Sequence, residues 1–91
     1  MKTSIKKAHQ ANNIADLIIY RLYKRMEGFD EDDYKRVDRL FARLEKKLLS
    51  INNSKILITQ FWTAERCWIN NEDIECRAEL TRLKSLLKPF F

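Results

Sequence analysis

The sequence has one glycine, one proline, one histidine and two cysteines among its 91 residues. All-β domains need many glycine- and proline-containing turns, so this scarcity favours helices joined by short polar links. A disulfide-rich secreted scaffold would carry more cysteine, and we therefore interpret Cys67 and Cys76 as reduced thiols, with a disulfide between them as the alternative. One histidine and two separated cysteines do not form a zinc motif. The sequence predicts no metal and no other cofactor.

Long apolar runs are also missing. The longest extends from Leu17 to Tyr20, far short of the roughly 20 residues that span a bilayer. The basic N-terminal stretch contains no apolar segment of signal-peptide length. These absences predict a cytoplasmic protein that does not enter a membrane.

Enzyme motifs are absent too. The sequence contains no glycine-rich phosphate loop, no G-x-S-x-G, no H-E-x-x-H and no cysteine–histidine signature. We therefore predict that the protein is not an enzyme. The formal net charge is +5, which favours an anionic partner and disfavours a role as a DNA mimic.

The chain does contain four amphipathic segments with apolar residues three and four positions apart. We predict helices at about residues 4–27, 31–51, 54–68 and 71–88. Short links between such helices favour a compact antiparallel bundle in which all 91 residues form one all-α domain. The third segment could also be a strand by propensity, but it would have no partner strand.

The first segment carries a heptad seam, and capping residues mark the helix ends. Gly28 is expected to end the first helix in a left-handed conformation, Asp30 to cap the second and Asn70 to cap the fourth. The expected seam consists of Ile5, Ala8, Asn12, Ala15, Ile19, Leu22, Met26 and Phe29.

Basic residues form one face of the second predicted helix. At 100° per residue they fall within an arc of about 120°. The face consists of Lys35, Arg36, Arg39, Arg43, Lys46 and Lys47. Like charges four residues apart repel one another, so helix stability does not explain the pattern. We interpret the face as a partner-binding surface, and an ordinary solvated face of a basic protein is the alternative.

Apolar and aromatic residues suggest a second, weaker candidate surface. The third predicted helix is apolar over much of its circumference, so it is either buried between several neighbours or meets a partner. A tryptophan in so small a bundle is more often a core residue, which leads us to expect Trp62 in the core and to keep a partner contact as the alternative. Leu17 and Tyr20 point away from the seam and could form a contact patch.

The leading functional hypothesis is a small binding module, a monomer or homodimer, that acts through protein–protein interaction. It would serve as an inhibitor or adaptor docking on a larger complex, as many small phage and mobile-element proteins do; this is an analogy of size and class. The alternative is non-specific binding of a DNA or RNA backbone by the basic face. Sequence-specific DNA reading is disfavoured, because the helices are long and four acidic residues, 30–33, precede the face. Membrane-surface binding is disfavoured because the core requires the apolar face.

Overall fold

The computed structural model describes residues 2–91 and, apart from Met26, the side chains from residue 5 onward. Its elements follow the predicted segments closely. They are α1 (Lys2–Lys24), η1 (Arg25–Glu27), α2 (Glu31–Leu49), α3 (Lys55–Ile69), α4 (Asp73–Leu87) and η2 (Lys88–Phe90). The predicted all-α fold is confirmed, although α2 ends two residues earlier than expected and α4 begins two residues later. Within residues 2–91, no helix combines the length and apolar character needed to cross a membrane.

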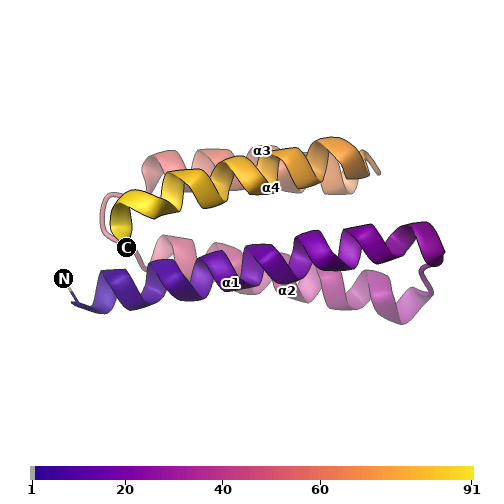
Figure 1. Ribbon diagram of the computed structural model, residues 1–91, viewed down its shortest axis with the longest axis horizontal. Helices are drawn as coiled ribbons and strands as arrows, with labels where there is room; N and C mark the ends of the chain where they lie inside the picture. Colours follow the sequence, from indigo (N-terminus) through magenta and orange to yellow (C-terminus); the bar gives the residue numbers. More distant parts are fainter. Residues whose placement is uncertain (1) are drawn as a thin grey trace.

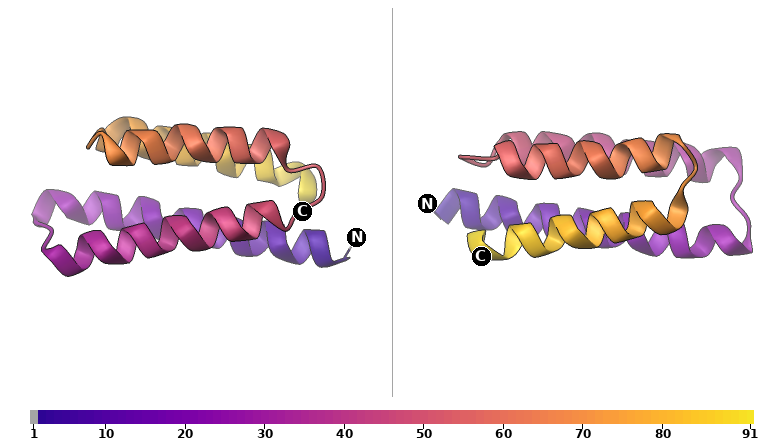
Figure 2. Two further views of the ribbon diagram at one scale, coloured as in Figure 1. Left: turned by 180° about the vertical axis from the view of Figure 1, so that it is seen from behind. Right: turned by 90° about the horizontal axis from the view of Figure 1, so that it is seen from above.

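The four helices run alternately up and down and form two layers, one from the α1/α2 hairpin and one from the α3/α4 hairpin (Figure 1). Each helix packs against its neighbours in the order α1, α2, α3, α4 and back to α1. The α1/α2 hairpin reaches beyond the α3/α4 hairpin at the end opposite the termini (Figure 2). This is the antiparallel bundle that short links between amphipathic helices predict.

One apolar core lies between the two layers, and every helix contributes to it. The contribution of α1 includes three fully buried alanines, Ala8, Ala11 and Ala15. Phe41 of α2 and Phe61 of α3 are the largest fully buried side chains, and their ring centroids are 5.9 Å apart.

The buried face of α1 differs from the expected seam. Ala8, Ala15 and Leu22 are buried as expected, but Ile5 is exposed and Ile19 is only partly buried. The residues that replace the unburied positions are Ala11, Ile14 and Ile18. A helix in a four-helix bundle packs against two neighbours and therefore buries a broader face than a two-stranded seam. The expected seam position at Met26 lies outside the described side chains.

The capping residues at the start of α2 behave as the sequence predicts. The Asp33 amide donates to Asp30 Oδ1 at 2.9 Å, and the Asp30 amide donates to Asp33 Oδ2 at 3.1 Å. The two residues thus form a reciprocal capping box. Gly28 has a φ of 114°, a backbone conformation that residues with a side chain rarely adopt. The turn between α1 and α2 is therefore specified by its own residues.

Replacing Asp30 with alanine should lower the free energy of unfolding by about 1 kcal/mol, because the Asp33 amide loses the side-chain oxygen that caps it. For a chain of this size the melting temperature should fall by roughly 4–8 °C. Asp32→Ala is the matched control, since Asp32 is an exposed neighbour whose side chain makes no capping hydrogen bond. Equal losses in the two variants, measured by thermal denaturation, would show that charge near the helix terminus matters and the cap does not.

The predicted cap of α4 is wrong. Asn70 ends α3, and its amide donates to the carbonyl of Arg66 at 3.0 Å. Asn71 then adopts a left-handed conformation with a φ of 60°, and α4 begins only at Asp73. The Asp73 side chain accepts a hydrogen bond from Arg25 of the other hairpin, 2.7 Å away. The Asp73 carboxylate therefore makes a long-range contact, and no described side chain caps α4.

Arg25 joins the two hairpins at the end opposite the termini. Its guanidinium donates to Asp73 Oδ1 at 2.7 Å and to Asn71 Oδ1 at 3.2 Å. Three aromatic rings also surround it, those of Tyr34, Trp68 and Phe29, with centroids 5.0, 5.6 and 5.9 Å away. Because the side chain is largely enclosed and already paired, Arg25 serves the fold and does not belong to a free basic surface.

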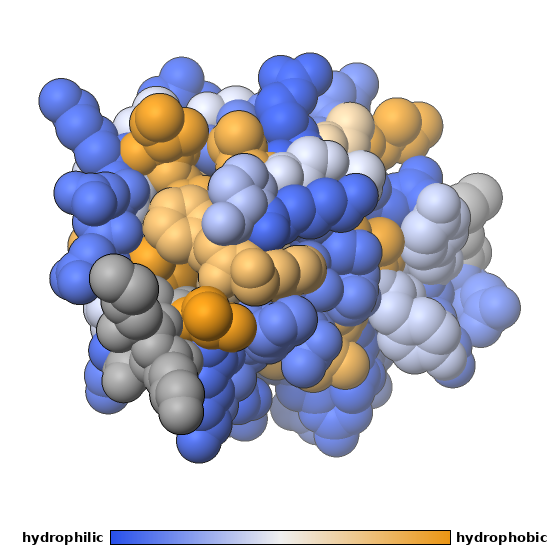
Figure 3. Space-filling model, turned by 60° about the vertical axis from the view of Figure 1, so that its left-hand side comes forward, coloured by the Kyte–Doolittle hydropathy of each residue, from blue (hydrophilic) through white to orange (hydrophobic). Residues whose placement is uncertain are grey.

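The C-terminal residues dock on the bundle. Phe90 packs against the core, and the Phe91 ring stacks on His9 with centroids 4.2 Å apart. Figure 3 shows the end of the molecule where both termini lie, with apolar side chains gathered among hydrophilic ones. His9 is an exposed residue of α1 that supports the last aromatic ring. The tail thus covers the end of the core.

Candidate functional site: a basic groove between α1 and α2

The structure brings five of the six residues of the predicted basic face to the side of α2 that faces α1. Arg36, Arg39, Arg43, Lys46 and Lys47 line a groove between these two helices. The sixth residue, Lys35, is not among the lining residues, and its ammonium lies 3.9 Å from Glu31 Oε1. The predicted face is therefore part of a site that two helices build.

The other wall of the groove is formed by α1, and the sequence analysis did not include it. Lys7 and Arg21 add two cations to this wall, and Gln10 and Asn13 add amide groups between them. We call this site the basic groove. It is lined by Lys7, Gln10, Asn13, Ile14, Leu17 and Arg21 of α1, by Arg36, Arg39, Leu40, Arg43, Lys46 and Lys47 of α2, and by Ser50. Seven of these described lining residues are cations, and none is a carboxylate.

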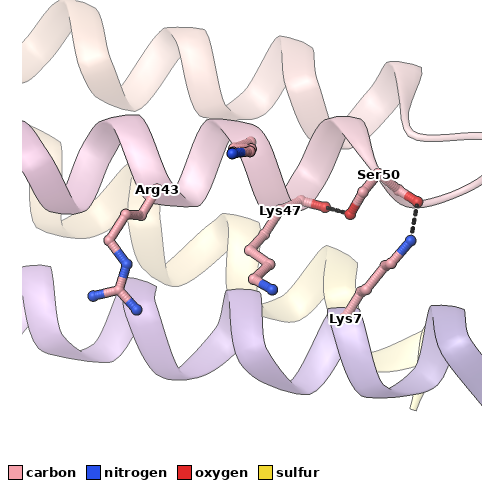
Figure 4. A pocket seen from close by; sticks show the side chains of 5 residues that line it. Lys7, Arg43, Lys47 and Ser50 are labelled. Carbon is pink, nitrogen blue, oxygen red and sulfur yellow. Dashed lines mark hydrogen bonds between the residues drawn. The ribbon is translucent and has the colours of Figure 1, made fainter.

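The basic groove is a continuous surface and does not enclose a single deep cavity. Three hollows of about 470, 260 and 240 Å³ share Arg43 as a common wall. In the largest, Arg43 and Lys47 extend from α2 toward α1, and Lys7 extends back from α1 (Figure 4). The Lys7 ammonium donates to the carbonyl oxygen of Ser50 at 3.2 Å, which ties α1 to the end of α2. Such a long, open surface is better shaped for a macromolecule than for an enclosed small ligand.

The carboxylates of α1 and α2 near the groove are directed to other flanks of their helices. Asp16 of α1 pairs with Lys84 of α4. On α2, Asp38 accepts from Trp68 Nε1 at 2.8 Å and Glu45 accepts from Trp62 Nε1 at 3.2 Å, both on α3. On α2, Asp38 and Glu45 therefore face α3, whereas the groove cations face α1. The described groove lining contains cations and no carboxylate, and an anionic partner would relieve the repulsion among these cations.

The three apolar candidates from the sequence do not form one patch. Leu17 is 49% exposed and lies in the groove beside Arg43 and Lys47. Tyr20 is exposed on α1 but is not a lining residue, and the Lys24 ammonium lies 5.2 Å from its ring centroid. Only Leu17 therefore belongs to the basic groove.

The expectation that Trp62 belongs to the core is wrong, because its side chain is 53% exposed. The broad apolar surface of α3 is divided: Ile58 is buried, whereas Trp62 and Ile69 face outward. The reason is geometric, since residues about 100° away from the core-facing side of a bundle helix lie at its margin. The hydrogen bond from Trp62 to Glu45 holds the ring against α2.

Three carboxylates lie close together where α2 packs against α3. Glu65 of α3 lies near Glu45 and Asp38 of α2, and burial together with these two carboxylates raises the pKa of Glu65. A carboxyl group whose pKa is raised by folding holds its proton more tightly in the folded state. Its ionisation therefore lowers stability as the pH rises above the unfolded value, near 4.5.

Glu65→Gln should slightly raise the melting temperature at pH 7, because the neutral amide removes the repulsion from Glu45 and Asp38. The difference from the unmodified protein should shrink as the pH falls below 4.5, where Glu65 is itself protonated. Thermal denaturation between pH 3 and pH 7 measures this. A stabilising effect of the same size across that range would rule out the electrostatic cause.

The two cysteines are free thiols, so the alternative disulfide is not formed. The Cys76 thiol donates to the carbonyl of Ala64 at 3.4 Å. Burial, followed by the neighbouring Cys67 and Asp73, raises the pKa of Cys76 to about 12, and burial also raises that of Cys67. Neither thiol has the lowered pKa of a reactive nucleophile. Residues 2–91 also contain no group of three or more histidine, cysteine or carboxylate side chains that could hold a metal ion.

Comparisons of the chain with protein-family models, with curated proteins and with solved structures found no match. The basic groove is therefore interpreted from its own residues.

Proposed function

We propose that the protein is a small binding module whose basic groove holds an acidic surface of a partner protein. The observation that carries this proposal is the groove lining, in which seven cations from two helices occur without a carboxylate. Charge complementarity of this kind steers association and favours one class of partner over others. The exposed side chain of Leu17 supplies an apolar contact within the same surface.

An inhibitor or adaptor that docks on a larger complex fits this arrangement. The molecule is compact, with a radius of gyration of 12.7 Å, so it presents a rigid two-helix face without a large domain behind it. Small proteins of phages and mobile elements work in this manner by covering a surface, an analogy of size and class. Such a protein would inhibit its target or link two partners by binding alone.

Nucleic-acid binding through the same groove is the second candidate, because phosphate groups also attract clustered arginine and lysine. The aromatic side chains that stack on single-stranded bases are absent from the described groove lining. This feature favours a protein partner over a single-stranded nucleic acid.

Affinity capture of the tagged protein from its native host, with and without nuclease treatment, separates the two candidates. We expect a protein that co-purifies in both samples and is released by raised salt, because the groove attracts its partner through charge. Loss of all bound material after nuclease treatment would support nucleic-acid binding and contradict the proposed function.

A further inference from the structure

The chemistry along the basic groove indicates the form of the acidic partner as well as its charge. This inference rests on the proposed function, because it concerns the same site. Leu17 lies at the centre of the groove, in a hollow that also includes Ile14, Arg43 and Lys47. Leu40 lines the adjoining hollow from α2. An apolar strip with cations on both sides is complementary to an apolar strip with carboxylates on both sides.

The spacing of the cations matches that of another helix. Arg36, Arg39, Arg43 and Lys46 follow each other at steps of three and four residues on α2. At 1.5 Å per residue these steps are about 4.5–6 Å long, close to the 5.4 Å pitch of an α-helix. A helix lying along the groove with one carboxylate per turn on its α2 edge would therefore meet a cation at almost every turn of that edge. On its α1 edge, carboxylates near its two ends would meet Lys7 and Arg21.

The length of the groove sets the length of its occupant. The two cations of the α1 wall, Lys7 and Arg21, are separated by about 21 Å at 1.5 Å per residue. A partner helix of about 14 residues, or four turns, covers that distance. A helix resting in a groove between two others is also the usual way in which an amphipathic helix buries its apolar face on a partner.

We propose that the basic groove binds an acidic amphipathic helix of a partner protein, about four turns long, with its apolar side chains on Leu17 and Leu40 and its carboxylates facing the cations of α1 and α2. The helix forms the fifth rod of the assembly and lies outside the α1/α2 layer. Leu17, which is 49% exposed in the free protein, becomes buried in the complex.

Synthetic peptides provide the test. The probe is an amphipathic peptide of about four or five turns with leucine along one face and glutamate on both flanks. The comparison peptide has the same composition, with leucine and glutamate permuted so that no helical face is apolar. Fluorescence anisotropy should show the amphipathic peptide binding about tenfold more tightly or better, since only it places leucine on the groove floor. Circular dichroism should show that it gains helix on binding.

Leu17→Gln should weaken binding of the amphipathic peptide by about fivefold or more, because the apolar contact is lost. Ile56→Gln is the matched control: Ile56 is an exposed apolar residue of α3, outside the groove, and its replacement should leave the affinity unchanged. Melting temperatures of both variants verify that the fold is intact.

Other outcomes separate this inference from the proposed function. If both peptides bind equally and Leu17→Gln has no effect, but reversing Arg39 and Arg43 to glutamate abolishes binding, the helix is wrong and the acidic-partner function stands. If reversing the arginines also has no effect, both proposals fall. If neither peptide binds while a single-stranded RNA oligonucleotide does, the partner is a nucleic acid and both are wrong.

Discussion

Reversing the charges of Arg39 and Arg43 to glutamate should remove partner binding while the protein stays folded. Both residues are exposed and line the groove, and the double variant leaves five cations there and adds two carboxylates. An acidic partner would then meet like charges at the middle of the surface. We expect the affinity to fall by about a hundredfold or more, measured by capture from the native host or by titration with the partner once it is identified.

The free energy of unfolding of this double variant should change by less than about 1 kcal/mol, because exposed charges contribute little to stability. Within that limit we expect a slight increase, because the repulsion along Arg39, Arg43 and Lys47 is removed. The matched control is Lys55→Glu with Arg66→Glu, which makes the same charge change at two exposed positions of α3. Equal loss of binding in the control would show that total charge matters and the groove does not.

Replacing Phe61 with alanine should destabilise the protein by about 3–5 kcal/mol. The Phe61 side chain is completely buried at the centre of the bundle, where it packs against Phe41. A domain of this size has a total stability on the order of 5–15 kcal/mol, so the variant should be partly unfolded at moderate temperature. Chemical denaturation followed by circular dichroism measures the loss.

The neighbouring Trp62→Ala variant is the control for Phe61→Ala. Trp62 is the larger residue, but more than half of its surface is already exposed. Its replacement should cost less than half as much, because it removes marginal packing and one exposed hydrogen bond to Glu45. A greater loss for Trp62→Ala than for Phe61→Ala would contradict the position of α3 in the bundle.

Local sequence signals predicted the helices well, because each depends on residues close together in the chain. The Asp30 cap and the positive φ of Gly28 are examples, since a capping box and a glycine turn depend on residues a few positions apart. The apolar residues three and four positions apart in α2 are likewise the ones on its buried side, namely Val37, Phe41, Leu44 and Leu48. The periodicity argument therefore identifies the helices and most of their inner faces.

The sequence did not predict how the helices turn toward one another. Trp62 shows the limit. The helical period gives the direction of its side chain relative to the core-facing side of α3, but whether α2 or solvent lies in that direction depends on the packing of the bundle. The start of α4 shows a second limit, since Asp73 is engaged by Arg25, 48 residues away. No local pattern contains that contact.

The candidate site was predicted in part. The basic face of α2 is visible in the sequence because its residues share one helix. Lys7 and Arg21 were missed because they belong to α1 and approach the face only when the two helices pair. The seven-residue spacing of Lys7, Ile14 and Arg21 could have identified them, because residues seven apart share one side of a helix.

Site-specific photo-crosslinking in the native host tests the central claim most directly. A photoreactive amino acid at Asn13, which lines the basic groove, is compared with the same residue at Thr63, which is exposed on α3. We predict a crosslinked protein partner from position 13 and none from position 63. A partner captured from position 63 alone would contradict the assignment of the basic groove as the binding surface.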